Sequence, residues 1–152
     1  MPSSQSQLLC FEDYPVGRKF ITPSRTVTET DVVNYAALSG NWAPLHCDVE
    51  YAKTTRYGQR IVQGGLTYTI SIGLSMHVPD VFGDVIANYG VDKMRFPNPV
   101  FINHTIRSEL EIVDAQDHDM GGVLSYLHKV MNQRGEVVCA FTQRILIRKR
   151  GV

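Results

Sequence analysis

Hydrophobic and polar positions in the first third of the chain follow a helical pattern between two turn-forming segments. Thr28 and Asp31 have the spacing of a capping box, in which each side chain accepts a hydrogen bond from the other's backbone N–H. The apolar residues that follow at helical spacing are Val32, Val33, Tyr35, Ala36 and Leu38. Gly40 suits the left-handed backbone at a helix end. The pattern predicts a helix from Thr28 to Gly40, preceded by a strand over residues 18–27 that Pro23 interrupts.

Two more helices are predicted before residue 76. Pro44 is expected to prevent the first helix from restarting at once, and Asp48 is a suitable N-cap for a short helix that Gly58 ends. Residues 66–76 are apolar or small on nearly every side, although Thr, Ile and Gly give them a poor helix propensity. Because only burial would keep such a segment helical, we place it at the centre of the domain.

Beyond residue 85 the pattern changes to the two-residue alternation of β-strands. Ile106 and Leu110, for example, lie on one face, with Arg107 and Glu109 on the other. The predicted strands are 85–91, 105–112, 123–131 and 137–147, with a rigid connector at 96–100 and turns at 117–122 and 132–135. The sum predicts an α+β fold, a single domain whose antiparallel sheet wraps around a central apolar helix.

Composition favours one domain with little charge on its surface. The 152 residues suffice for one domain, which we place at residues 11–150, behind a flexible N-terminus at 1–10. The 15 basic and 15 acidic residues balance, so neither nucleic acid nor an anionic membrane is indicated as a partner. Charged residues make up only 20% of the chain, which is typical of a surface partly buried against another subunit.

Cysteine spacing and hydrophobic runs bear on the compartment. Cys10, Cys47 and Cys139 are an odd number at wide spacing, which indicates neither a disulfide framework nor a metal site. No apolar run approaches the roughly 20 residues of a membrane span, and the first residues lack the pattern of a signal peptide. We therefore expect a cytoplasmic protein with free thiols.

Candidate chemistry concentrates in the turn at residues 39–48. Asn41, His46 and Asp48 bring an amide, an imidazole and a carboxylate into this segment. Asp48 is more readily explained as the cap of the next helix than as a catalytic group. Cys47 beside His46 suggests a nucleophile, but side chains adjacent in sequence usually point apart. The remaining histidines are expected to lie at the surface or to have hydrogen-bond partners: His77, His104, His118 and His128.

Several stretches of the chain resemble the MaoC-like dehydratases. They are Phe11-Glu12-Asp13, Thr26-Val27-Thr28-Glu29, Tyr35-Ala36-Ala37-Leu38-Ser39-Gly40, Pro44-Leu45-His46 with Asp48, Tyr57-Gly58, and Arg95-Phe96 with Pro99-Val100. This family includes the (R)-specific enoyl-CoA hydratases and has the hot-dog fold, so the resemblance implies a hydratase or dehydratase acting on acyl-CoA thioesters. It also implies a homodimer or higher homo-oligomer with the pocket between subunits, and no cofactor beyond the coenzyme A of the substrate.

The resemblance also implies roles for single residues. In the family, an Asp and a His activate a water that adds to the β-carbon of the enoyl thioester. A backbone N–H at the start of the central helix stabilises the enolate oxygen. Carried over to this chain, His46 matches the catalytic histidine and Gly64 supplies the N–H. Contacts with the substrate or the oxyanion are expected from Gly64, Gly65, Gln63 and Trp42.

The chain departs from the family pattern at its site. Asn41 stands where the family has the catalytic Asp, and its amide can orient a water but cannot accept a proton. The other departures are Ala43 for Asn, Gln63 for His and Ile72 for Ser. A carboxylate from elsewhere in this chain or from a neighbouring one is an alternative source of the missing group.

Three functions therefore stay open. The first is a hydratase in which His46 activates the water and Asn41 positions it. The second is a thioesterase, which a carboxylate near the central helix would favour, and residues 64–78 contain none. The third is a catalytically degenerate subunit that binds acyl-CoA or pairs with an active partner. Asn41 and Ala43 favour that third function, whereas the retained His46 argues against it.

Overall fold

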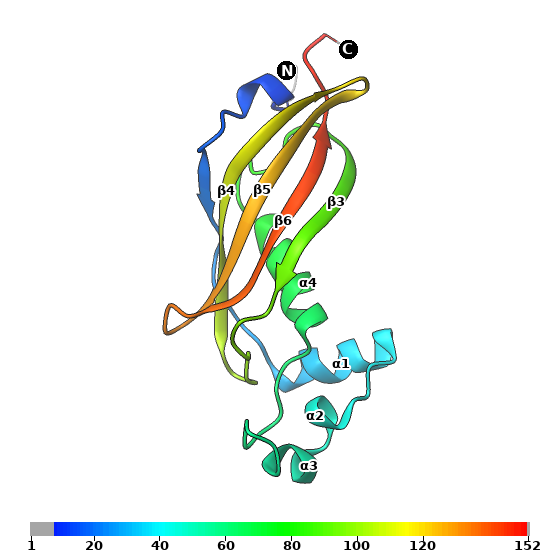
Figure 1. The fold of residues 1–152 in the computed structure, drawn as a ribbon, viewed down its shortest axis with the longest axis vertical. Coiled ribbons are helices and arrows are strands. Elements are labelled where there is room, and N and C mark those ends of the chain that lie inside the picture. Colours follow the sequence, from blue (N-terminus) through cyan, green and yellow to red (C-terminus); the bar gives the residue numbers. More distant parts are fainter. Residues whose placement is uncertain (1–7, 152) are drawn as a thin grey trace, which may run out of the picture.

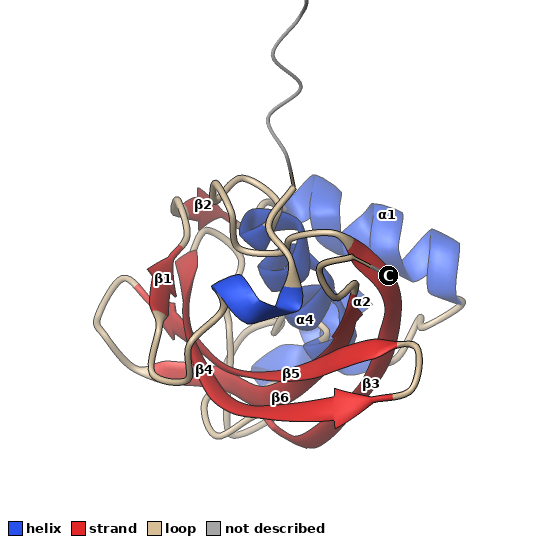
Figure 2. Ribbon diagram, turned by 90° about the horizontal axis from the view of Figure 1, so that it is seen from above, coloured by secondary structure: helices blue, strands red, loops and turns tan. Residues whose placement is uncertain are grey.

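A curved antiparallel sheet wraps around one helix in the computed structural model, which describes residues 8–151 (Figure 1). The helix is α4 (Gly64–Ser75). The strands, in order across the sheet, are β1 (Lys19–Ile21), β4 (Thr105–His118), β5 (Gly121–Asn132), β6 (Val137–Ile147) and β3 (Val85–Arg95), and β2 (Arg25–Thr26) also pairs with β4. Figure 2 shows the sheet curving around α4, so the predicted architecture is confirmed. Residues 1–10 were predicted to form a flexible N-terminus, and residues 1–7 of this segment lie outside the described residues.

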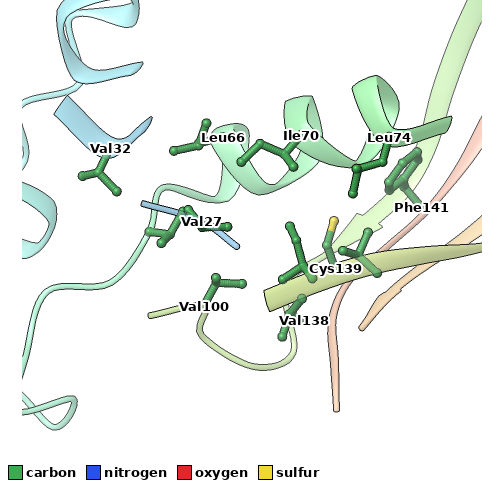
Figure 3. Close-up of a cluster of buried hydrophobic side chains, with 12 residues drawn as sticks. Val27, Val32, Leu66, Ile70, Leu74, Val100, Val138, Cys139 and Phe141 are labelled. Carbon is green, nitrogen blue, oxygen red and sulfur yellow. The ribbon is translucent and has the colours of Figure 1, made fainter. Parts of the chain in front are cut away.

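Burial against the sheet holds α4 helical despite its poor propensity. Its buried residues include Leu66, Ile70 and Leu74. Figure 3 shows these side chains in one cluster with Val138, Cys139 and Phe141 of β6. Burying one such aliphatic side chain contributes about 1.5–3 kcal/mol, whereas a poor helix former costs at most about 1 kcal/mol. Burial therefore decides the conformation of this segment.

Strand pairing extends several elements beyond their predicted ends. β4 and β5 pair as far as His118 and Gly121, which leaves a turn at residues 119–120 in place of the one predicted at 117–122. β3 likewise continues to Arg95, beyond the short strand that was predicted. Backbone N–H and C=O groups of these residues find partners in the neighbouring strand, and this outweighs the turn-forming side chains.

Three helices project beyond one end of the sheet (Figure 1). They are α1 (Glu29–Ser39), α2 (Pro44–Cys47) and α3 (Val49–Lys53). The predicted capping box is confirmed, with Thr28 N donating to Asp31 Oδ2 over 2.8 Å and Asp31 N donating to Thr28 Oγ1 over 3.3 Å. Pro44, expected to prevent α1 from restarting at once, is the first residue of the separate helix α2, where its missing N–H costs no hydrogen bond. Among the described residues, no helix is long and apolar enough to cross a membrane.

The apolar face predicted for α1 is only partly covered within this chain. Val32 and Ala36 are buried, but Leu38 is 86% exposed and Val33 is 44% exposed. Trp42, just beyond the helix, is 56% exposed. Large exposed apolar side chains close together along the chain are typical of a surface that another molecule covers.

Two of the histidines that were expected to lie at the surface or to have hydrogen-bond partners are instead buried, with ring nitrogens that lack a partner among the described residues. His104 is 8% exposed, and its Nδ1 has no partner in the described part of the chain. His128 on β5 is fully buried and stacks on Phe141 with ring centroids 4.3 Å apart. Neither of its ring nitrogens has a hydrogen-bond partner within residues 8–151. Burial lowers the pKa of His128 to about 3, and the neighbouring Gln143 offsets only part of that effect.

Candidate active site

A hydrogen bond fixes the ring of His46 in α2. Its Nδ1 lies 2.8 Å from the carbonyl oxygen of Ile61. A carbonyl oxygen can only accept, so Nδ1 carries a proton, and Nε2 of the neutral ring is then left as an acceptor. The N–H of Ile61 in turn donates to the Leu45 carbonyl over 3.3 Å. The half-buried ring therefore has the orientation and tautomer that a general base needs.

His46 lines a cavity of about 230 Å³ beside the start of α4. Four other segments contribute to its wall: α4 itself, the loop after α3, the connector between β3 and β4, and β6 through Val138. Besides the backbone of Gly64, these segments contribute the polar and aromatic residues Thr67, Arg56, Tyr57, Phe96 and Asn98. The cavity therefore depends on tertiary structure that brings distant segments together.

The start of α4 offers free backbone donors to this cavity. The first N–H groups of a helix have no acceptor within it, and no side chain among the described residues caps α4. Gly64 lines the cavity, where an added Cβ would lie 3.1 Å from the ring of Phe96. These N–H groups, together with the partial positive charge of the helix start, can stabilise an oxyanion.

Charge on the cavity wall comes from Arg56. Its Nη2 donates to Tyr57 Oη over 2.8 Å, and its guanidinium carbon lies 4.9 Å from the centre of the Tyr57 ring. No Asp or Glu belongs to the wall as residues 8–151 form it. In the same part of the chain, no three His, Cys, Asp or Glu side chains gather into a group that could hold a metal ion.

The structure brings together some of the predicted site residues and separates others. His46 and Gly64 meet in one cavity. Asn41 and Trp42 do not belong to its wall in the described chain. The exposed Asn41 side chain instead accepts a hydrogen bond from Ala43 N at 3.4 Å through its Oδ1.

Gln63 and Gly65 join α4 to α1 and do not contribute to the cavity wall that residues 8–151 form. Gln63 is buried, and its Nε2 donates to the Val32 carbonyl over 3.2 Å. A Cβ on Gly65 would lie 2.1 Å from the hydroxyl oxygen of Tyr35. The predicted capping role of Asp48 is confirmed, because its Oδ1 accepts from Tyr51 N over 2.9 Å.

Sequence reasoning missed Arg56, Thr67 and Asn98 as residues of the cavity wall. Their place in it depends on how the loop after α3 and the connector fold over α4. The only signal in the sequence was indirect, since Tyr57-Gly58 and Arg95-Phe96 took part in the family resemblance.

Comparison with known proteins gives the family. The model of the family described as "MaoC like domain" matches residues 12–132. The chain belongs to this family. Its architecture is the hot-dog fold. Family members include hydratases and dehydratases.

Solved structures resemble this MaoC-like chain over nearly its whole length. The monoamine oxidase regulatory protein from Archaeoglobus fulgius is 40% identical, with 94% of this chain and 96% of that one covered and a TM-score of 0.89. The R-hydratase from Pseudomonas aeruginosa is 26% identical, with 95% and 88% covered and a TM-score of 0.74.

Among curated proteins, beta-methylmalyl-CoA dehydratase from Chloroflexus aurantiacus is 31% identical over 145 residues, which are 92% of this chain and 40% of that protein. Three of the curated relatives are much longer than this chain, which spans 29%, 40% and 41% of their lengths. The MaoC-like chain therefore corresponds to part of each of these proteins.

The contact between Gly65 and Tyr35 predicts an unequal effect of two alanine substitutions in α4. Gly65→Ala forces a Cβ against the Tyr35 hydroxyl and is expected to lower the free energy of unfolding by about 1–3 kcal/mol. A Cβ added to Gly73 would have no described atom within 4 Å, so Gly73→Ala should raise that free energy by up to about 1 kcal/mol. Urea unfolding measures both, and equal effects would contradict the close approach of α1 and α4.

Proposed function

We propose that this MaoC-like chain catalyses the reversible addition of water to 2-enoyl-CoA thioesters. The observation that carries the proposal is that His46, oriented by the Ile61 carbonyl, shares a cavity with the uncapped start of α4. A base and an oxyanion site on one cavity are what this reaction needs. The likeness to an R-hydratase and to a dehydratase of a CoA thioester supports the same chemistry.

In this mechanism His46 Nε2 takes one proton from a water molecule, and the water oxygen forms a bond to the β-carbon. The electron pair of the double bond moves toward the thioester carbonyl, whose oxygen becomes an enolate. The N–H of Gly64 donates to that oxygen. The protonated His46 then delivers its proton to the α-carbon, so that one water has been added across the double bond.

The proposal keeps for Asn41 the predicted role of positioning the water, although Asn41 lies outside the cavity wall that residues 8–151 form. Its amide can donate to or accept from water, but it cannot take up a proton as the Asp of the family does. A positioned general base contributes about 10²–10⁴-fold to a rate. We therefore propose a hydratase that is slow for its family, with His46 responsible for all of the proton transfer.

Asn41→Asp is expected to raise kcat for hydration by about 10²-fold, because it adds a carboxylate that can share the proton transfer. The measurement is the initial rate at saturating crotonyl-CoA for both proteins. Glu50→Gln, at an exposed position outside the cavity wall that residues 8–151 form, serves as a control. An unchanged kcat in Asn41→Asp would show that this position takes no part in the reaction.

We further propose a homodimer or a higher homo-oligomer located in the cytoplasm. Exposed apolar side chains on α1 and on the edge strand β3, such as Leu38 and Tyr89, support an interface between copies. The free thiols Cys10, Cys47 and Cys139 suit a reducing compartment. A membrane and nucleic acid are not proposed as partners.

One assay tests the proposed reaction against its two rivals. Purified protein is mixed with crotonyl-CoA, and the absorbance of the conjugated double bond is followed beside the release of free thiol. Loss of the double bond without thiol supports the hydratase. Thiol release would instead identify a thioesterase. Binding without any reaction, combined with hydration by Asn41→Asp, would identify a degenerate subunit, the function that the Asn41 replacement favours.

A further inference from the structure

We propose that the cavity of His46 accepts an acyl group that carries its own carboxylate, and that Arg56 binds this carboxylate. The proposal rests on the proposed function, since it names the class of substrate for the same site. It assigns Arg56 a role in specificity that the arrangement of charges around the cavity supports.

The described wall of the cavity carries a positively charged side chain and no negatively charged one. Arg56 is the charged residue on the cavity wall, and no acid accompanies it there in the described structure. The neighbouring segment 39–47 also lacks acidic residues, because Asn41 stands in place of a carboxylate. A negatively charged acyl group would therefore be attracted by Arg56 and would meet no carboxylate on the described wall of the cavity.

Arg56 differs from most other arginines of the chain in having no acidic partner among the described residues. Seven of the ten arginines form ion pairs with Asp or Glu. Arg56 instead has a tyrosine partner, since its Nη2 donates to Tyr57 Oη. A guanidinium with an open carboxylate-binding edge is suited to an anionic ligand.

Tyr57 holds this guanidinium in place. The hydrogen bond of 2.8 Å and the stacking distance of 4.9 Å fix the guanidinium over the ring of a residue that itself lines the cavity. One of the five N–H donors is used, and the remaining donors are free for a bidentate contact with a carboxylate. Such prior ordering lowers the entropy cost of binding.

Coenzyme A offers a second source of anionic oxygen, its phosphates. They stand at the far end of the pantetheine arm, roughly 15 Å from the sulfur if the arm extends like four to five residues. A carboxylate on the acyl group stands only a few bonds from the reacting carbons. Because His46 and Arg56 line the same cavity of about 230 Å³, we assign Arg56 to the acyl carboxylate, which stays close to the reacting carbons, and not to the distant phosphates.

The test compares two thioesters that differ in one end group, crotonyl-CoA with a methyl and fumaryl-CoA with a carboxylate. The wild-type protein should favour fumaryl-CoA in kcat/KM, and Arg56→Met should lower that preference by about 10–100-fold, as expected for one charge-assisted contact. Arg56→Lys should keep part of it. Lys53→Met is the control, since it removes an exposed cation that pairs with Glu50 outside the cavity.

The same variants on N-acetylcysteamine thioesters, which have no phosphates, separate the two anions. A loss of preference that persists with these thioesters supports the acyl carboxylate. An Arg56→Met defect that is equal for both acyl groups and disappears without the phosphates would assign Arg56 to coenzyme A and overturn the proposal.

Calorimetric binding of succinyl-CoA and butyryl-CoA provides a readout that needs no turnover. Tighter binding of succinyl-CoA that is lost in Arg56→Met supports the inference even if neither enoyl thioester is hydrated, and in that case only the proposed reaction fails. Equal binding of the two thioesters by the wild-type protein would overturn the inference while leaving the hydratase proposal intact.

Discussion

Replacing His46 with alanine is expected to lower kcat/KM for enoyl-CoA hydration by about 10²–10⁴-fold. The proposed mechanism assigns both proton transfers to Nε2 of this ring. The Ile61 carbonyl fixes the tautomer that leaves Nε2 free. With Asn41 unable to accept a proton, no second base compensates. Steady-state rates with crotonyl-CoA and fumaryl-CoA measure the loss.

Two further variants separate catalysis from structure at this position. His46→Asn can still donate to the Ile61 carbonyl, because its amide nitrogen takes the place of Nδ1, but it has no basic nitrogen, so its rate should be as low as that of His46→Ala while its fold is kept. His77→Ala, which removes an exposed histidine near the end of α4, should leave the rate unchanged. Full activity of His46→Asn would show that the ring is structural.

Replacing His128 with phenylalanine is expected to remove a large part of the protein's sensitivity to acid. The pKa of this histidine is about 3 in the folded protein and near 6.5 in the unfolded chain. Between these values the unfolded chain binds a proton that the folded protein does not, so stability is lost as the pH falls below about 6.5. Each pH unit costs about 1.4 kcal/mol, or roughly 3 kcal/mol between pH 6.5 and 4.5.

Urea unfolding at about pH 7 and about pH 4.5 measures this contribution. His128→Phe should lose roughly 3 kcal/mol less than the wild type between the two conditions, and its ring can keep the stack on Phe141. His77→Phe, at an exposed position, should behave like the wild type. Equal losses in wild type and His128→Phe would contradict a neutral, buried imidazole.

Local signals in the sequence were sufficient for most of the fold. Thr28, Asp31 and Gly40 act through neighbours within a few residues, so the start and end of α1 could be predicted from spacing alone. The alternation in β4 likewise depends on a backbone period that side chains follow directly. The end of β3 could not be found in this way, because Arg95 belongs to the strand through its pairing with Ala140 on β6.

The site was predictable to the extent that it lies in one segment. His46 was identified from its motif, and it lines the same cavity as Gly64, while the catalytic roles of both residues stay predictions. Arg56 could not be identified, since nothing in its own sequence neighbourhood shows that it faces this cavity. For His128 the signal existed, because the alternation of Leu124, Tyr126 and Val130 places position 128 on the inward face. Because histidine is polar, the alternation was not taken as evidence that His128 is buried.

A crystal structure of the protein with bound 3-hydroxybutyryl-CoA, the product of hydration, would show directly whether His46 and the start of α4 form the active site. We expect the 3-hydroxyl to lie within about 3 Å of His46 Nε2 and the thioester oxygen to accept a hydrogen bond from Gly64 N. A thioester bound away from the cavity between His46 and Gly64, or one whose carbonyl oxygen makes no contact with the start of α4, would contradict it.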